Sequence, residues 1–271
     1  MTRRRTTRPT LAARADRHRL YEAAVQTPDV ECEFIDAVYK ERVGRLPLRL
    51  REDFCGTGTM AAEWARRGPQ RMAYGVDLDP EPLAWGAAHH LARLPPTVRR
   101  RVKLLQADVR TARTPPVDVV VALNFSYWVF KDRATLRGYF AAARRALARD
   151  GMLLLDAYGG TDAYRILRER TALRGFEYVW HQADYDPISG DYSCHIGFRF
   201  PDGSSLPRAF SYHWRLWTLP EIRELLAEAG FSRVSVQMQG YDQDGEPDDE
   251  YKEVARGEPD PAWIAYIVAE R

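Results

Sequence analysis

The chain lacks several features that would narrow its class at once. It has three cysteines among 271 residues, and their wide spacing supports neither a disulfide framework nor a zinc site. No run approaches eighteen apolar residues, so we expect no membrane-spanning helix. The N-terminus is rich in arginine without an apolar segment behind it, which argues against a secretory signal. These absences predict a cytoplasmic protein with no metal and no membrane.

A strong net charge is also missing, because the formal charge is +2. Its distribution is nevertheless uneven: residues 1–20 carry seven arginines and one acid, and residues 242–253 carry seven acids and one lysine. A basic arm could attract phosphates, although a solvated tail has the same composition. The acidic stretch would repel nucleic acid, so we do not expect a nucleic-acid partner.

What is present from residue 46 onward is an alternation of strands and helices. This pattern is typical of a doubly wound, Rossmann-like α/β fold with a mostly parallel sheet. We expect seven strands, the last antiparallel, and a continuous core over residues 46–271. The expected strands are Leu46–Glu52, Arg71–Asp77, Val102–Gln106, Val117–Asn124, Met152–Tyr158, Phe231–Gln239 and Trp263–Ala269; the expected helices are Thr59–Arg67, Pro80–Leu94, Thr135–Arg149 and Leu219–Ala229.

The alternation breaks between residues 161 and 217. Residues 161–173 read as a helix, and the aromatic-rich runs Phe176–Tyr185, Tyr192–Phe200 and Arg208–Thr218 read as an antiparallel meander with turn residues between them. We interpret 161–217 as an inserted cap on the acceptor side and as a candidate homo-oligomer contact. Residues 1–45 precede the core and read as an arm followed by a helical lid.

A glycine-containing loop, residues 52–59, joins the first expected strand to the first helix. Gly56 and Gly58 carry no Cβ, so the backbone there can turn sharply and approach a ligand closely. The free N–H groups of the helix start then face that ligand. Cys55 reads as a small loop residue rather than a catalytic thiol, because no base stands beside it in sequence.

Four short motifs, in this order, resemble the class I S-adenosylmethionine-dependent methyltransferases. They are Cys55-Gly56-Thr57-Gly58, Gly75-Val76-Asp77-Leu78-Asp79-Pro80, Gln106-Ala107-Asp108-Val109 and Ala122-Leu123-Asn124-Phe125-Ser126-Tyr127. Each motif alone is a weak signal, but four at βαβ spacing are specific. The resemblance covers residues 46–271 and implies a methyltransferase whose cofactor is S-adenosylmethionine.

The resemblance also implies a role for each matching residue. The acid after the second strand accepts the ribose hydroxyls, as in dinucleotide-binding folds. The glycine loop lies against the methionine end of the cofactor, and a residue of the N-terminal helices covers it. The implied cofactor residues are Tyr21, Cys55, Gly56, Thr57 and Gly58, with Asp77 for the ribose, Leu78, Asp108 and Val109 for the adenine, and Asn124 near the sulfonium.

The first motif departs from the family pattern in one respect. The family has an acid two residues before the first glycine of GxGxG, and that glycine is Phe54 here, so the acid position falls on Glu52. Asp53 is the adjacent candidate, and strand alternation lets only one of the two point into the site. Ala61, three residues after Gly58, also satisfies a nicotinamide fingerprint, so a dehydrogenase stays an alternative. The later motifs favour the methyltransferase.

The acceptor side is less readable. We expect aromatic side chains of the insertion to form a dry pocket, with residues after the fourth and fifth strands. A general base is required only if the acceptor must lose a proton early, as an alcohol must. The candidate pocket residues are Trp128, Tyr158, Tyr178, Trp180, Tyr212, Trp214 and Arg215, and the candidate catalytic residues are Tyr127 and His213.

The predicted function is methyl transfer to the nitrogen or oxygen of a small molecule. One alternative is an RNA or protein amino-methyltransferase, because the ends of Asn124-Phe125-Ser126-Tyr127 match an Asn-Pro-Pro-Tyr pattern whose two prolines are missing here. A second alternative is a cofactor-binding regulatory protein without acceptor chemistry. Methyl incorporation and cofactor binding separate the three.

Overall fold

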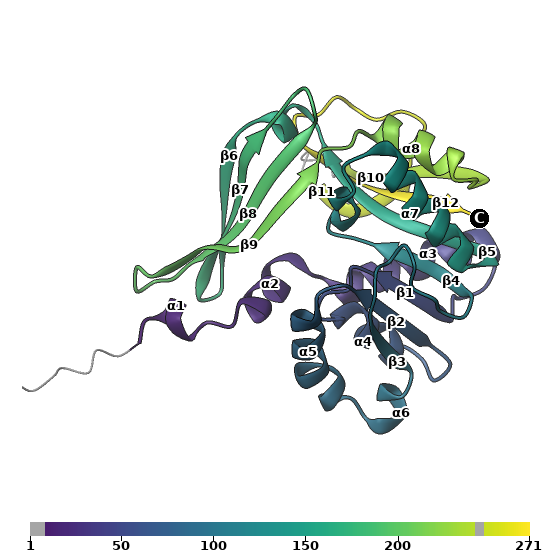
Figure 1. The fold of residues 1–271 in the computed structure, drawn as a ribbon, viewed down its shortest axis with the longest axis horizontal. Helices are drawn as coiled ribbons and strands as arrows, with labels where there is room; N and C mark the ends of the chain where they lie inside the picture. Colours follow the sequence, from purple (N-terminus) through teal and green to yellow (C-terminus); the bar gives the residue numbers. More distant parts are fainter. Residues whose placement is uncertain (1–8, 242–246) are drawn as a thin grey trace, which may run out of the picture. The chain divides into compact units, whose positions relative to one another are not determined.

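The protein is described by a computed structural model over residues 9–241 and 247–271 (Figure 1). The arginines of the basic arm up to Arg8 and the acids among residues 242–246 lie outside the described residues. The chain divides into two compact units. One joins Met1–Gln26 to Arg165–Leu216, and the other joins Thr27–Tyr164 to Trp217–Arg271. Within the described residues, no helix combines the length and the hydropathy that crossing a membrane requires.

The larger unit is built on an eight-stranded sheet in the order β11-β10-β12-β5-β4-β1-β2-β3. Strands β1 to β5 are parallel to one another, and β12 runs antiparallel to β5 and β10. This confirms the doubly wound α/β class. The strands are β1 Arg49–Asp53, β2 Met72–Asp77, β3 Val102–Gln106, β4 Val117–Ala122, β5 Leu147–Gly159, β10 Arg233–Tyr241, β11 Pro247–Glu253 and β12 Trp263–Glu270.

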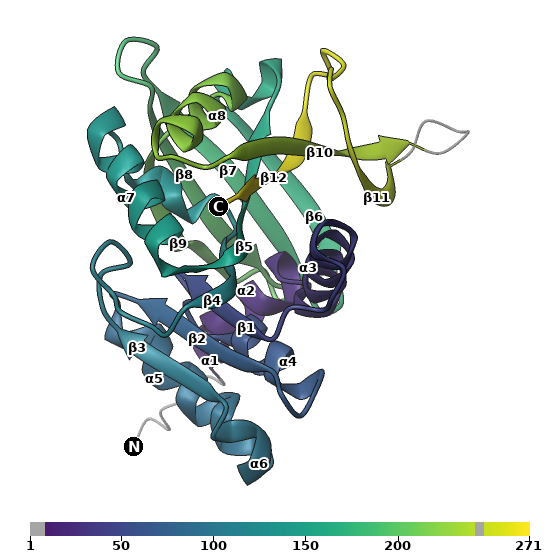
Figure 2. The ribbon, with the colours of Figure 1, turned by 90° about the vertical axis from the view of Figure 1, so that its right-hand side faces the viewer.

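Helices cover both faces of this sheet. Figure 2 shows α3 and α4 on one side of it and α7 and α8 on the other. Every residue of β4 is buried, which explains why its sequence is apolar apart from Asp118. The helices are α3 Pro28–Val43, α4 Thr59–Arg66, α5 Pro80–His89, α6 Pro96–Arg99, α7 Arg133–Ala146 and α8 Leu219–Glu228, with short 3₁₀ turns η1 Leu91–Arg93, η2 Ser126–Val129 and η3 Thr161–Tyr164.

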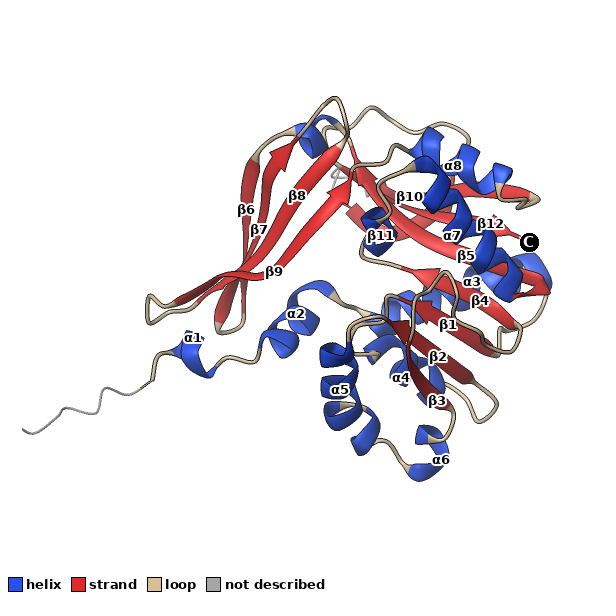
Figure 3. Ribbon diagram, in the orientation of Figure 1, coloured by secondary structure: helices blue, strands red, loops and turns tan. Residues whose placement is uncertain are grey.

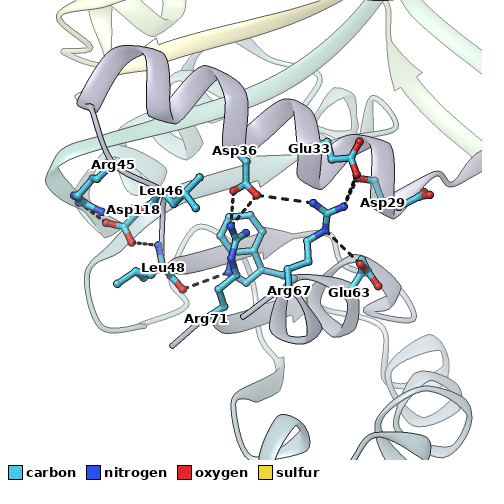
Figure 4. Close-up of polar contacts among 11 residues, drawn as sticks. Asp29, Glu33, Asp36, Arg45, Leu46, Leu48, Glu63, Arg67, Arg71 and Asp118 are labelled. Carbon is cyan, nitrogen blue, oxygen red and sulfur yellow. Dashed lines mark hydrogen bonds and ion pairs between the residues drawn. The ribbon is translucent and has the colours of Figure 1, made fainter. Parts of the chain in front are cut away.

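Ion pairs attach α3 to α4 and the adjoining loop (Figure 4). The Arg71 guanidinium donates to both oxygens of Asp36 at 2.8 and 2.7 Å, and it lies 4.3 Å from the centre of the Trp64 ring. Arg67 bonds Glu33 at 2.9 Å and Glu63 at 3.3 Å. Helix α3 is therefore part of the larger unit, whereas the chain up to Gln26 belongs to the other.

The smaller unit is a four-stranded antiparallel sheet with two helices. Figure 3 shows its strands following one another without intervening helices. Helix α1 lies beside the β8–β9 turn, because Leu11 N–H donates to Asp202 at 2.7 Å and Ala12 N–H to Ser204 at 3.0 Å. The meander is confirmed. Its elements are β6 Leu167–Leu173, β7 Phe176–Tyr185, β8 Asp191–Arg199 and β9 Ser205–Arg215, with α1 Leu11–Arg14 and α2 Arg17–Val25.

Two sequence predictions were wrong. Residues 161–173 are not one helix: after the η3 turn, β6 pairs antiparallel with β7. Leu, Arg, Glu and Ala favour a helix in isolation, but pairing with a neighbouring strand outweighs that local preference. The central sheet also has eight strands among the described residues rather than seven, because β11, which we did not expect, pairs with β10.

Candidate functional site

The loop after β1 contains three left-handed residues, Phe54 at φ 58°, Gly56 at φ 53° and Gly58 at φ 66°. A Cβ on Gly58 would stand 2.7 Å from the end of the Leu104 side chain, which would have to shift, and the φ of 66° itself favours glycine. A Cβ on Gly56 would meet no atom within 4 Å. Space is therefore free beside the Gly56 backbone, where a ligand can approach closely. Phe54, where the family has glycine, adopts the same kind of backbone conformation.

Asp77, at the end of β2, ties the second motif to the glycine loop. Its Oδ2 accepts the Gly56 N–H at 2.7 Å, and its Oδ1 accepts the Asp79 N–H at 2.9 Å. Each carboxylate oxygen has a further lone pair for a ligand hydroxyl. The next residue, Leu78, exposes 68% of its surface. A partly buried acid beside an exposed apolar side chain suits a ribose joined to a flat base.

Glu52 and Asp53 point to opposite faces of β1, as strand alternation predicts. Asp53 is committed inside the protein: it pairs with Arg51 at 2.7 Å and accepts the Tyr139 hydroxyl at 3.1 Å. Burial raises the pKa of Asp53 to about 6 although Arg51 opposes the shift. Glu52 accepts the Ala61 N–H at 3.0 Å, at the start of α4. Burial raises the pKa of Glu52 well above its usual range.

Asp108 lies beyond the end of β3, and its carboxylate is already paired. Arg110 donates to Oδ1 at 3.0 Å and to Oδ2 at 2.6 Å. These bonds hold the pKa of Asp108 below its usual value. Val109 is buried, and its carbonyl accepts Arg51 at 2.6 Å. An adenine amino group at Asp108 would have to share the carboxylate with Arg110.

Asn124 and Phe125 form a turn at the end of β4, and both have φ 57°. Their N–H groups donate to the two oxygens of Asp156 on β5, at 2.7 and 2.9 Å. Asp156 is only 8% exposed, and burial raises its pKa to about 7. The sequence analysis missed this residue. The one available signal was an acid inside the apolar run of β5.

The aromatic residues beside this turn are packed rather than free. Tyr127 and Trp128 are fully buried, and the Tyr127 hydroxyl donates to the Asp156 carbonyl at 2.8 Å. Burial raises the Tyr127 pKa well above its usual value. The Tyr158 ring lies 4.6 Å from Phe125 and 4.9 Å from Trp128. This burial argues against the catalytic role that we expected for Tyr127.

A second acid that the sequence analysis missed is Glu31, in the first turn of α3. Burial, and then the charges of Asp156 and Asp29, raise its pKa to about 7. Glu31 in turn contributes to the raised pKa of Glu52. Acids from α3, β1 and β5 therefore share one region of the larger unit. Among the described residues, no three His, Cys, Asp or Glu side chains are grouped to hold a metal ion.

In the smaller unit, aromatic residues of β7 to β9 line one face, which we call the aromatic face. Tyr212 stacks on Trp214 at 4.4 Å, with Trp180 at 6.4 Å from Trp214. Burial, and then neighbouring Tyr21, raise the pKa values of Tyr178 and Tyr212. The phenols therefore stay neutral near neutral pH.

Helix α2 also contributes to the aromatic face. Tyr21 packs 5.0 Å from Phe210, so it lies in the smaller unit and not in the unit of the glycine loop. Buried His18 lies 5.9 Å from the same ring. The sequence analysis missed His18, although its three-residue spacing from Tyr21 places both on one helix face.

His213 and Arg215 lie on the other face of β9. The exposed His213 ring makes a 3.3 Å hydrogen bond with the Ser193 hydroxyl opposite it. Arg215 is paired in register with Asp191. Because neighbouring strand residues point to opposite faces, His213 does not share a face with Tyr212.

The geometry agrees with a comparison to known families. Residues 55–153 match a family model described as a methyltransferase domain. The chain therefore contains a methyltransferase domain over these residues, which carry its likeness to the S-adenosylmethionine-dependent methyltransferases. The matched range contains all four motifs from Cys55 onward, together with the Asn124–Phe125 turn.

The chain is 29% identical over 191 residues to a malonyl-[acyl-carrier protein] O-methyltransferase of Geobacter sulfurreducens. The match covers 70% of this chain and 58% of that protein, so the chain spans less than two thirds of its curated relative. Two solved structures share the fold. One is an S-adenosylmethionine-dependent methyltransferase from Clostridium acetobutylicum, at 17% identity and TM-score 0.67, covering 93% of this chain and 96% of that one. The other is an amino pentose methyltransferase from Micromonospora echinaspora, at 19% identity and TM-score 0.64, covering 94% and 95%.

The residues of this domain fit S-adenosylmethionine as the cofactor. Open space beside Gly56, the acid Asp77 bonded to the same loop, and the exposed Leu78 are features that a nucleoside attached to a methionine would use. Asp53 is a poorer fit than the partly buried acids Asp77 and Asp108, because it is only 1% exposed and its carboxylate bonds Arg51 and Tyr139.

Proposed function

We propose that this protein transfers a methyl group from S-adenosylmethionine to the nitrogen or oxygen of a small-molecule acceptor. The observation that carries the proposal is the 2.7 Å hydrogen bond between Asp77 and the Gly56 N–H. It joins the acid of the second strand to the left-handed glycine loop. The two motifs therefore form one cradle rather than two unrelated turns.

Each part of the cradle has a separate task in this proposal. When bound, the cofactor supplies an electrophilic methyl group on a sulfonium. Asp77 accepts the ribose hydroxyls, and Leu78 covers one face of the adenine. Glu52 and the glycine loop position the methionine end, with Glu52 preferred over Asp53 because Asp53 is internally paired. Asn124 presents its polar groups to the reacting end.

For the acceptor, we propose the aromatic face of the smaller unit, with α1 and α2 forming part of the same cap. Its rings and neutral phenols can surround a small ring or an amine and exclude water. The residues that define it are Tyr178, Trp180, Tyr212 and Trp214, and the Glu169 carboxylate of β6 lies opposite Trp180 in the register of the sheet. A neutral amine attacks with its own lone pair and needs no base. This chemistry favours nitrogen over oxygen as the accepting atom.

The names of two relatives include both a nitrogen-bearing and an oxygen acceptor. One acts as an amino pentose methyltransferase and another as an O-methyltransferase of a malonyl group on a carrier protein. The role of the β6–β9 sheet in a homo-oligomer contact stays a separate proposal, tested by the molar mass in solution.

The RNA or protein amino-methyltransferase has less support. Proline is restricted to φ near −65°, whereas Phe125 has φ 57°. The turn therefore differs in conformation from an Asn-Pro-Pro-Tyr loop, and the Tyr127 ring is buried rather than free to stack on a target base. A regulatory protein without transfer activity is separated by measuring turnover.

Two measurements test the proposal. Titration calorimetry with S-adenosylmethionine, its demethylated product and NAD should show binding of the first two and not of NAD. Labelled methyl groups offered with a cell extract should enter the small-metabolite fraction. Label found mainly in RNA or protein would support the alternative acceptor class, and binding without any transfer would support the regulatory protein.

A further inference from the structure

The turn after β4 is held in a conformation that its residues do not favour. Asn124 and Phe125 are consecutive, neither is glycine, and both have φ 57°. Asparagine tolerates this region, but an aromatic residue seldom adopts it. Such a pair persists only when surrounding groups fix it, and conformations of this kind are concentrated at functional sites.

The group that fixes this turn is the Asp156 carboxylate. One oxygen accepts the Asn124 N–H at 2.7 Å, and the other accepts the Phe125 N–H at 2.9 Å. Both oxygens are therefore used, and the side chain is 8% exposed. The Asp156 carbonyl is bonded as well, by the Tyr127 hydroxyl at 2.8 Å. One residue of β5 thus holds three successive parts of the β4 loop.

A second buried carboxylate, at the other end of β4, also accepts two backbone N–H groups but has different surroundings. Asp118, also 8% exposed, accepts the Leu48 N–H at 2.7 Å and the Arg49 N–H at 2.8 Å. It has an ion pair with Arg45 at 2.8 Å. Burial raises the Asp118 pKa, but the bonds from Arg45 and the two N–H groups outweigh it and the net shift is downward.

At Asp156 the balance is reversed, because burial dominates over its backbone bonds and raises the pKa. The groups that face it are acidic or neutral: Glu31 from α3, Tyr127 from η2 and Tyr266, its partner in register on β12. A charged carboxylate here destabilises the folded protein. We therefore attribute its presence to the turn that it holds rather than to the stability of the fold.

We propose that Asp156 is a positioning residue for methyl transfer: by accepting the N–H groups of both Asn124 and Phe125, its carboxylate holds the turn at the reacting end in its working conformation. This inference rests on the proposed function, because it assigns that turn to the reacting end. Asp156 acts through the turn and does not itself touch the methyl group.

Protonation is the natural way to disturb this arrangement. A protonated carboxyl has an O–H that donates, so it can no longer accept both N–H groups equally well. The ionised form then gives the active turn, and methyl transfer should have an acid limb near pH 7, where Asp156 titrates. Because Glu31 titrates in the same range, Glu31→Gln is needed to separate the two carboxyls.

The first experiment uses the wild-type protein. Carboxyl carbons are followed by NMR against pH, together with the amide protons of Asn124 and Phe125. The two amide signals should move with the Asp156 carboxyl and share its midpoint, and the methyl-transfer rate should follow the same curve. Amide signals that ignore this titration would overturn the proposal without any variant.

The second experiment compares Asp156→Asn with Asp118→Asn. The amide retains one accepting oxygen but presents an NH₂ to the second N–H group. Asp156→Asn should lower kcat by about 10- to 100-fold, as misplacement at a reacting centre does, and it should abolish the acid limb. Asp118→Asn should lower the thermal midpoint while leaving kcat within about twofold and the pH profile unchanged, because its N–H partners lie at the far end of the sheet.

Asp156→Glu, which restores a carboxylate, should recover part of the rate and the acid limb. An Asp156→Asn protein that keeps the wild-type kcat, or keeps the acid limb, would contradict the inference. If the variant does not fold, the wild-type NMR titration still decides. The proposed function fails separately: a wild-type protein that binds no cofactor or transfers no methyl group contradicts the function, whereas active wild type with an unaffected variant contradicts only the role of Asp156.

Discussion

A carboxylate at each end of β4 accepts two consecutive backbone N–H groups, Asp118 through one oxygen and Asp156 through both. At the amino end Asp118 accepts two backbone N–H groups and is neutralised by Arg45. At the carboxyl end Asp156 accepts two backbone N–H groups, with acidic Glu31 close enough for each charge to act on the other. One carboxylate is placed to stabilise the fold, and the other is kept charged at a cost.

This difference follows the general position of sites in open α/β sheets. Ligands bind beyond the carboxyl ends of parallel strands. We therefore expect charged groups and strained backbone that contribute to binding at that edge of the sheet. The left-handed residues Phe54, Asn124 and Phe125 all lie there. The amino end of the sheet carries Arg45, Asp118 and the connection to α3. There the charged groups pair with one another and with backbone N–H groups.

We expect the largest effect from removing the carboxylate at the amino end of β4. Asp118→Ala leaves the Leu48 and Arg49 N–H groups without their acceptor, at about 1–3 kcal/mol each. It also removes one of the two carboxylate partners of Arg45, which keeps Asp150 at 2.8 Å. We expect the free energy of unfolding to fall by about 3–5 kcal/mol, measured by chemical denaturation. The affinity for S-adenosylmethionine should stay within about twofold, since the site is remote. A large loss of affinity without loss of stability would contradict the structural role that we assign to Asp118.

At the carboxyl end of the sheet, Asp77→Ala should lower the affinity for the cofactor more than the stability of the fold. It removes the acceptor of the Gly56 N–H and the proposed acceptor of the ribose hydroxyls. Charged hydrogen bonds contribute about 1.5–3 kcal/mol each, so cofactor affinity should fall by about 100-fold or more. Asp79→Ala is the matched control, because Asp79 caps α5 by accepting the Glu81 N–H and should affect stability more than binding. Unchanged affinity in Asp77→Ala would contradict the ribose assignment.

The sequence predicted the groups that are local to a motif and missed those that depend on distant partners. The glycine loop, Asp77 and the buried β4 can be read from residues adjacent in sequence. Asp156 could not be assigned, because its role depends on a turn 31 and 32 residues away. Strand β6 was read as a helix for the same reason: its exposed residues have no apolar alternation, and only pairing with β7 makes it a strand.

The pH dependence of stability should also separate the two ends. Asp156 and Glu31 have pKa values raised to about 7 in the folded protein, so the folded state binds their protons more tightly than the unfolded state. Their contribution is full below pH 4 and is lost as the pH rises through 7, at up to about 1.4 kcal/mol per pH unit for each proton. Asp118, with a lowered pKa, contributes above its unfolded pKa and loses this only in acid.

Thermal midpoints measured between pH 5 and 8 should therefore fall as the pH rises, and the slope should flatten in Asp156→Asn. Methyl transfer should change in the opposite direction over the same range. A stability that rises from pH 5 to pH 8 would mean that burial does not raise the pKa values of Asp156 and Glu31 in the folded protein.

The smallest expected effect concerns a residue that belongs to neither end. His213 was a candidate base in the sequence, but its exposed ring bonds Ser193 on the face of β9 opposite Tyr212. His213→Ala should leave kcat within about twofold, whereas loss of a general base costs about 10²- to 10⁴-fold. Tyr212→Phe is the companion variant: it keeps the ring stacked on Trp214 and removes one hydroxyl from the aromatic face. A raised KM in Tyr212→Phe with an unaffected His213→Ala would place acceptor binding on the aromatic face, and the reverse result would restore His213 as the base.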